Sequence, residues 1–262
     1  MRIATWNVNS IRSRIDRVAD WLERSDVDAV ALQETKCRDD QFPEDRFAAL
    51  GYEVTHQGFS QWNGVAIVSR VGLVDVEVGF PGQPGYGDPI VDEARAIGAT
   101  CGDVRLWSLY VPNGREVGHE HYAYKLDWLE RLRQAASGWL AADPHAQVAL
   151  TGDWNIAPQD EDVWDMAAFD GHTHVSEAER EVFRAVIDSG FSDVVRPFTP
   201  GPGVYTYWDY QRLRFAKREG MRIDFVLASQ PLAARVTDAM IDRQERKGKG
   251  PSDHAPVIVT VS

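Results

Sequence analysis

The chain is short of cysteine, of long apolar runs and of basic charge, and each shortage excludes a class of protein. Its 262 residues hold two cysteines, Cys37 and Cys101, which cannot build a disulfide framework and which we expect to be packed thiols in a reducing compartment. No apolar run is long enough to cross a membrane, and Arg2–Asn7 has the pattern of a strand, not of a signal peptide. These shortages predict a cytoplasmic protein with no membrane partner.

Basic residues are outnumbered, with 28 Lys and Arg against 40 Asp and Glu and a formal net charge of -12. This balance argues against non-specific coating of nucleic acid but is compatible with a local basic rim around an acidic pocket. The sequence also has no Gly-rich phosphate loop, no evident Ser or Cys nucleophile and no Ser/Gly linker. An apolar content of 44% suits a sizeable core, so we expect a single domain over residues 1–262.

Short apolar runs alternate with helical patterns, which is typical of an α/β fold. The runs predicted to be buried strands are Ile3–Trp6, Ala29–Leu32, Gly64–Val68, Leu106–Val111, Val148–Leu150, Ile223–Leu227 and Val257–Val261. Apolar residues at three- and four-residue steps predict helices over Ile11–Arg24, Glu120–Leu140 and Ser176–Ser189. The Gly- and Pro-rich stretch Phe80–Pro89 predicts a loop.

Polar residues stand at the ends of these runs. Asp153 and Asn155 follow Val148–Leu150, and residues two apart in a strand face the same side. An isolated Asp or Asn in such a place is usually a turn or a helix cap. The coincidence recurs at most of the predicted strands, where the polar residues are Asn7, Glu34, Tyr110, Asn113, Asp224, Asp253 and His254. Because open α/β folds bind ligands at strand ends, this recurrence predicts a common site.

The residue types at these ends suggest a reaction. Glu34 with Asp and Asn neighbours offers hard oxygen ligands, which suit Mg²⁺ or Mn²⁺ better than Zn²⁺. His254 with an acidic partner is a pair that handles protons or stabilises charge. Asn7 and Asn155 can hold phosphate oxygens without adding negative charge. Hydrolysis of a phosphodiester by an activated water is the economical interpretation. His172 and His174 could bind a metal as a pair, but no matching metal ligands follow them in the sequence. We therefore expect them to lie in a surface loop.

Six motifs occur in the order of a known family: Trp6–Arg12, Leu32–Lys36, Tyr110–Gly114, Gly152–Pro158, Met221–Asp224 and Ser252–Val257. On these motifs, which span essentially the whole chain, the protein resembles exonuclease III, the bacterial apurinic/apyrimidinic endonuclease of the endonuclease/exonuclease/phosphatase superfamily. The Gln33-Glu34 and Asp253-His254 pairs mark only the superfamily. The nuclease branch is indicated by Ile156-Ala157-Pro158, by Asp160 and Asp162, and by Tyr205–Tyr210.

The resemblance implies a four-layered α/β sandwich, with two packed mixed β-sheets flanked by helices. It implies Mg²⁺, or Mn²⁺ in its place, held mainly by Glu34, with Asn7 and Asp253 close by and Asp153 and Asn155 adjoining.

The same resemblance implies a role for each catalytic residue. Asp153 would orient or deprotonate the attacking water, and Asn155 would hold the scissile phosphate. His254, paired with Asp224, would stabilise charge in the transition state, and Tyr110 would contact the phosphate or the leaving group.

Contacts with DNA are predicted from three basic clusters that adjoin these motifs. They comprise Arg212, Arg214, Lys217, Arg218 and Arg222; Arg243, Arg246, Lys247 and Lys249; and Arg12, Arg14 and Arg17. Basic clusters are usually solvated faces, but their position favours contacts with the phosphate backbone. Asn113 is a further expected contact. By resemblance, Tyr207, Trp208 and Met221 would form an apolar pocket for a flipped abasic sugar. The sequence has Tyr207 where Trp is usual in the family, and Gln211 where Arg is usual.

The leading hypothesis is therefore a Mg²⁺-dependent repair nuclease, acting as a monomer on double-stranded DNA with abasic sites or 3′ ends. It would be an exodeoxyribonuclease III with 3′-to-5′ exonuclease, abasic-site endonuclease and 3′-end-cleaning activities. One alternative is a phosphatase or lipid phosphodiesterase of the same superfamily, against which Asn155–Pro158 and the basic clusters weigh. Another is a non-catalytic binding protein, against which the presence of the metal and acid positions weighs: Glu34, Asp153, Asp224 and His254.

Overall fold

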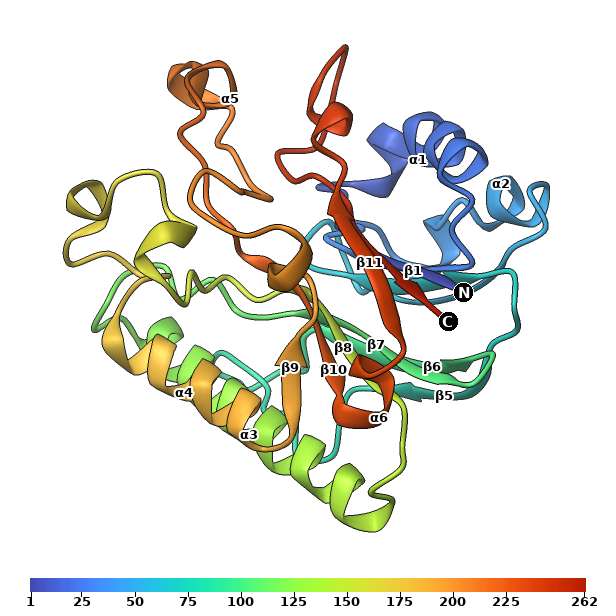
Figure 1. The fold of residues 1–262 in the computed structure, drawn as a ribbon, viewed down its shortest axis with the longest axis horizontal. Helices are drawn as coiled ribbons and strands as arrows, with labels where there is room; N and C mark the ends of the chain where they lie inside the picture. Colours follow the sequence, from blue (N-terminus) through green and yellow to red (C-terminus); the bar gives the residue numbers. More distant parts are fainter.

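Two six-stranded sheets pack face to face at the centre of the computed structural model, which describes residues 1–262 (Figure 1). The first sheet has the order β11-β12-β1-β2-β4-β3. Its strands are β1 (Arg2–Asn7), β2 (Ala29–Gln33), β3 (Glu53–Gln57), β4 (Val65–Ser69), β11 (Val236–Ile241) and β12 (Val257–Val261).

The second sheet has the order β5-β6-β7-β8-β10-β9. Its strands are β5 (Val74–Val78), β6 (Ala96–Cys101), β7 (Val104–Tyr110), β8 (Val148–Asp153), β9 (Phe191–Asp193) and β10 (Asp224–Ser229). Both sheets mix parallel and antiparallel pairs, because β1 runs parallel to β2 and β7 runs parallel to β8 while the other neighbours are antiparallel.

Helices cover the outer faces of both sheets. Helices α1 (Ile11–Ser25) and α2 (Glu44–Ala48) pack on the first sheet, and α3 (Glu120–Ala142) and α4 (Glu177–Asp188) pack on the second (Figure 1). The remaining helices are short: α5 (Arg214–Lys217), α6 (Gln230–Ala233), and the 3₁₀ turns Asp39–Gln41, Asp160–Asp162, Met166–Phe169, Arg196–Phe198, Gln211–Leu213 and Arg243–Arg246. The predicted four-layered α/β sandwich is thus confirmed.

Three apolar clusters fill the spaces between the four layers. One lies between the sheets and includes Ile3, Ile97 and Val226. A second joins α1 and α2 to the first sheet, and a third joins α3 and α4 to the second. The outer clusters are rich in tryptophan, with Trp6 and Trp21 in one and Trp107, Trp128 and Trp154 in the other. Burial of such large apolar surfaces is the dominant favourable term in folding.

Strand pairing brings polar residues from distant parts of the chain to one edge of the sandwich. Asp224 begins β10 directly opposite Asp153 at the end of β8. Tyr110, at the end of β7, pairs with Asp153 from the other side. In the first sheet, Asn7 ends β1 and Glu34 follows β2, while His254 precedes the antiparallel β12.

All seven predicted strands and all three predicted helices are present, but five strands were missed. Four of the missed strands, β3, β5, β9 and β11, are the edge strands of the two sheets, and β9 has only three residues. The fifth, β6, consists mainly of small residues. The β5 sequence does alternate apolar and polar residues, Val-Asp-Val-Glu-Val, which is a strand signal that the sequence analysis overlooked, although all five residues are exposed in the structure. Both cysteines are free and buried, as expected. None of the helices is both long enough and apolar enough to span a bilayer.

Candidate active site

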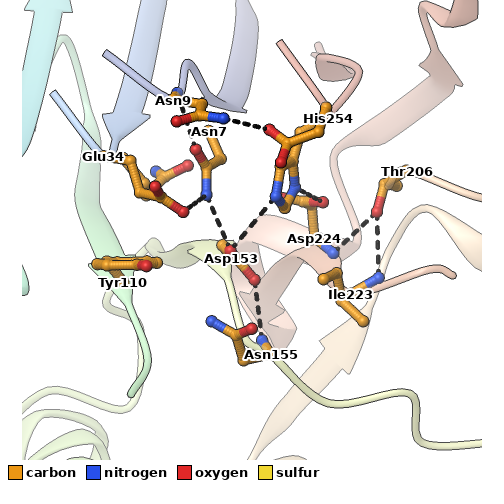
Figure 2. A network of polar contacts seen from close by, with 12 residues as sticks. Asn7, Asn9, Glu34, Tyr110, Asp153, Asn155, Thr206, Ile223, Asp224 and His254 are labelled. Carbon is orange, nitrogen blue, oxygen red and sulfur yellow. Dashed lines mark hydrogen bonds and ion pairs between the residues drawn. The ribbon is translucent and has the colours of Figure 1, made fainter. Parts of the chain in front are cut away.

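Asn7 connects the two carboxylates of the site. Its amide nitrogen donates to Glu34 Oε1 at 2.8 Å and to Asp153 Oδ2 at 2.9 Å (Figure 2). Its amide oxygen accepts from the backbone N–H of Asn9 at 3.0 Å. The donor side of Asn7 therefore faces the carboxylates, which suits a residue that orients them.

His254 and Asp224 form a buried pair beside Asp153. His254 Nδ1 lies 2.8 Å from Asp224 Oδ2, and His254 Nε2 lies 3.7 Å from Asp153 Oδ2 (Figure 2). Burial disfavours a charged imidazole, but the carboxylates of Asp224 and Asp153 outweigh it and raise the pKa of His254 to about 10. The imidazole is consequently a cation at neutral pH.

Burial shifts the pKa of Asp153 in the direction opposite to its effect on His254, because it disfavours an anionic carboxylate just as it disfavours a cationic imidazole. Burial raises the pKa of its carboxyl to about 7, and the negative charges of Asp224 and Glu34 add to this against the opposing effect of His254. A carboxyl poised near neutrality is suited to exchange a proton with a bound water. A divalent cation at the site would favour the ionised form.

Glu34 has a partner that the sequence analysis did not single out. Lys36 Nζ lies 2.7 Å from Glu34 Oε2 and also donates to Asn9 Oδ1 at 2.5 Å. Burial would raise the pKa of Glu34, but Lys36 and the Asn7 hydrogen bond outweigh it and lower that pKa below its ordinary value. Glu34 is therefore an ionised, hard oxygen donor.

Tyr110 lies beside Glu34 in the same cavity. Burial, together with the negative charge of Glu34, raises the pKa of the Tyr110 hydroxyl well above its ordinary value, so the hydroxyl stays protonated.

Asn155 is held in a left-handed conformation, with φ of 50°, immediately after β8. Its backbone N–H donates to Asp153 Oδ1 at 2.9 Å, and its amide nitrogen donates to the Val111 carbonyl at 3.0 Å. Asn113 Nδ2 donates to Asn155 Oδ1 at 3.2 Å. These bonds fix the direction of the Asn155 side chain before any ligand arrives.

His174 lies in a loop, as predicted, but its imidazole lines the cavity of the site, which the sequence analysis did not foresee. His174 Nε2 lies 3.2 Å from Asn155 Oδ1, whereas His172 is exposed. Burial, with the charge of Lys125, lowers the pKa of His174 to about 4, so its imidazole is neutral. No signal in the sequence separates the two histidines, since their difference arises from the packing of the loop.

The polar residues line a cavity of about 180 Å³, bounded by Glu34, Tyr110, Asn113, Asp153, Asn155, His174, Tyr207, Met221, Ile223, Asp253 and His254. One ligand atom each from Glu34, Asp153 and His254 lies within 4.8 Å of the others. The carboxylates of Glu34 and Asp153, in a solvent-accessible recess, provide the oxygen donors that a hard divalent cation requires. His254 is not available as a ligand because its imidazole is protonated. The donor set therefore fits Mg²⁺ or Mn²⁺.

A second cavity of about 230 Å³ adjoins the first through Tyr207 and Met221, which line both. Its other walls include Trp164, Phe169 and Arg214. Trp208, which was predicted to line the apolar pocket, is 1% exposed and packs in the core behind it. Trp164 provides the indole surface instead. The prediction failed because alternation along Tyr205–Tyr210 does not reveal which aromatic side chains face outward.

The three basic clusters contribute unequally to the surface. Arg222 is 1% exposed and pairs with Asp193 and Asp162, so the predicted contact with DNA backbone is wrong for this residue. Arg246 is buried and donates to backbone carbonyls. Arg214 and Arg17 have carboxylate partners in Glu219 and Glu245. The exposed members without an ion pair, which we call the basic rim, are Arg12, Arg212, Lys217, Arg218, Lys247 and Lys249.

A model of the Endonuclease/Exonuclease/phosphatase family matches residues 4–254. The chain belongs to that family. The exodeoxyribonuclease of Bacillus subtilis is 31% identical to it over 271 residues, and the match covers 100% of both chains. An AP endonuclease from Archaeoglobus fulgidus is 36% identical, with a TM-score of 0.92 over 100% of this chain and 99% of that one.

A 3′-5′ exonuclease from Neisseria meningitidis, NExo, is 35% identical, with a TM-score of 0.94 and 100% of both chains covered. A further NExo structure, described as a 3′ phosphatase bound to a product DNA hairpin, is 34% identical, with a TM-score of 0.93 over 100% of this chain and 99% of that one. The chain therefore lies in the exonuclease III branch of the family. The enzyme class predicted from the motifs, a hydrolase acting on DNA, is confirmed.

Proposed function

We propose that this exonuclease III-family protein is a Mg²⁺-dependent DNA-repair phosphodiesterase. Its substrates are double-stranded DNA with abasic sites or with 3′ ends. It combines cleavage at abasic sites, 3′-to-5′ removal of nucleotides and removal of blocking groups from 3′ ends. We further propose that it acts as a monomer.

The observation that carries the proposal is the convergence of Glu34, Asp153 and His254 within 4.8 Å at the bottom of one cavity. Glu34 and Asp153 would hold Mg²⁺, which would supply Lewis-acid chemistry toward a phosphoryl oxygen. Asp253 lies at the rim of the same cavity, where Asn9 Nδ2 donates to its carboxylate at 3.1 Å. Asn7 keeps the two carboxylates of Glu34 and Asp153 side by side.

The other residues divide the work of hydrolysis. Asp153 accepts a hydrogen bond from the attacking water and takes up its proton, for which its position and raised pKa are suited. Asn155, with Asn113 beside it, donates to a non-bridging oxygen of the phosphate. The His254 cation, held by Asp224, and the Tyr110 hydroxyl stabilise the negative charge that develops there.

The surroundings of the cavity support a DNA substrate. Members of the basic rim adjoin the site motifs in the chain: Arg12 lies at the start of α1, Arg212, Lys217 and Arg218 lie in or beside α5, and Lys247 and Lys249 precede Ser252. They would bind backbone phosphates near the cavity. The adjoining cavity combines the apolar side chains of Tyr207, Met221 and Trp164 with the charged side chains of Asp209, Arg214 and Glu219, and it would receive a sugar without a base.

A single assay tests the proposal. An end-labelled duplex with one abasic-site analogue is incubated beside an intact duplex and a duplex with a 3′ phosphate, with Mg²⁺ and with EDTA. We expect Mg²⁺-dependent incision of the first and Mg²⁺-dependent trimming or dephosphorylation of the others. Turnover of an inositol phosphate without any reaction on the three duplexes would instead identify a superfamily phosphatase. Tight binding without any turnover would identify a non-catalytic protein.

A further inference from the structure

Behind the active site lies an ion pair that the chemistry described above does not use. Lys125 of α3 and Glu179 of α4 are in contact, and both side chains are 0% exposed. A buried ion pair is weak evidence for stability, because the desolvation of two charges offsets much of their attraction. The contacts that these two side chains make with the surrounding loops point to another reason for their presence.

Lys125 binds the two segments that carry the asparagines of the site. Its ammonium group donates to the Asn155 carbonyl at 2.6 Å, to the Asn113 carbonyl at 3.2 Å, and to Glu179. These three bonds use all three hydrogens of the ammonium group. The carbonyl of Asn155 thus points into the interior, while its side chain points into the cavity.

Glu179 binds the loop that carries His174. One carboxylate oxygen accepts from Thr173 Oγ1 at 2.6 Å and from the His174 backbone N–H at 3.0 Å. The other oxygen accepts from the hydroxyl and the backbone N–H of Ser176, which caps α4. The Lys125–Glu179 pair therefore joins three loops, around Asn113, Asn155 and His174, whose side chains meet in the cavity.

The neighbouring backbone is built for this close approach. Gly114 has φ of 91°, and a Cβ at this position would lie 2.7 Å from Thr173 Oγ1 and 3.2 Å from the Cδ of Lys125. The Ala157 backbone N–H donates to the His174 carbonyl at 2.8 Å, which links two of the three loops directly. The loops are therefore packed too tightly to shift one at a time.

We propose that Lys125 and Glu179 are positioning residues that hold Asn155, together with Asn113 and His174, in the geometry required for catalysis. The inference rests on the proposed function, in which Asn155 binds the scissile phosphate. A small displacement of such a group lowers kcat far more than it weakens the binding of substrate. The reason is that the stability of the transition state depends more steeply on geometry than does that of the bound substrate. The basic rim lies on other segments of the chain, so its contacts with DNA should persist.

The test compares Lys125→Met with Leu132→Ala, a control on the same face of α3 two turns further on. Leu132 is fully buried in the apolar cluster and has no polar contact with the loops, so its truncation lowers Tm without moving them. We expect Lys125→Met to lower kcat by roughly 10- to 100-fold with little change in KM for DNA. Leu132→Ala should keep the wild-type kcat per folded molecule.

Equal kcat for Lys125→Met and Leu132→Ala, beside an active wild type, would overturn the positioning role. If Lys125→Met does not fold, Glu179→Gln, which keeps the shape and removes the charge, takes its place with the same expectation. Hydrogen exchange of residues 153–158 provides a readout independent of DNA cleavage. Exchange should accelerate in the Lys125 or Glu179 variant and not in Leu132→Ala; unchanged exchange contradicts the inference even if the wild type cuts no DNA.

Discussion

The pair His254 and Asp224 sets the expected pH dependence of the active site. Because the pKa of His254 is raised to about 10, its imidazole remains a cation until strongly alkaline pH. The unfolded chain has an ordinary histidine pKa near 6.5. The linked stabilisation is therefore fully present below that value and is lost as the pH rises through about 10.

We expect kcat to fall on the alkaline side as His254 loses its proton. In Asp224→Asn the carboxylate that does most to raise the pKa of His254 is gone, so the alkaline limb should move to lower pH. The measurement is kcat against pH for both proteins, with folding monitored by circular dichroism at each pH. A limb at the same pH in both proteins would show that His254 is not the titrating group.

A second prediction at this scale concerns Asp153. Asp153→Asn keeps the size of the side chain and removes the base, so kcat should fall by about 10²- to 10⁴-fold. Affinity for DNA should remain close to that of the wild type, because the side chain lies at the bottom of the cavity and not on the basic rim. Single-turnover cleavage and equilibrium binding measure the two quantities separately. Near-normal turnover would contradict the role of Asp153 in activating water.

At the scale of the element, β8 delivers Asp153 only because Gly152 precedes it. Gly152 has φ of 146°, and a Cβ there would lie 1.9 Å from the Leu109 carbonyl oxygen of β7. This contact is with backbone, so the two strands would have to separate. The register that places Tyr110 opposite Asp153 depends on that close approach.

Gly152→Ala should therefore reduce the free energy of unfolding by about 3 kcal/mol or more, and reduce activity with it. The matched control is Gly138→Ala in α3, where an added Cβ meets nothing within 4 Å. Alanine in an exposed helix interior should stabilise the protein by about 0.5–1 kcal/mol. Urea denaturation of both variants tests the pair, and equal effects of the two substitutions would contradict this account of β8.

At the scale of the whole molecule, charge is distributed unevenly. The formal net charge of -12 disfavours association with DNA in general. The basic rim counteracts this negative charge locally. Helix α5, with Arg212 just before it, lies on the opposite side of the molecule from most of α3 (Figure 1). Binding should therefore be oriented and sensitive to salt.

We expect Arg212→Ala and Lys217→Ala each to weaken DNA binding regardless of sequence and to reduce the slope of log affinity against log salt by about 1. Arg131→Ala, on α3, removes the same charge far from the rim and should leave the slope unchanged. Fluorescence anisotropy with a labelled duplex at several salt concentrations measures the slopes. Identical slopes for all three variants would place the DNA elsewhere.

The sequence by itself determined seven of the twelve strands, the three longest helices and the polar residues that follow several of these strands. Strand periodicity and helix periodicity are local properties, so Asp153 and Glu34 could be assigned to strand ends, and Asp224 to a strand, without knowledge of the fold. The motifs then indicated the family and, through it, the four layers.

Only the tertiary structure decided which side chains are buried and which meet. It buried Trp208 and Arg222, which the sequence predicted to face DNA, and it brought His174, Lys36 and Lys125 to the site. The physical reason is that burial and partnership depend on long-range packing. The energy of a charged or aromatic side chain is set by residues distant in sequence, such as Glu179 for Lys125 and Asp193 for Arg222.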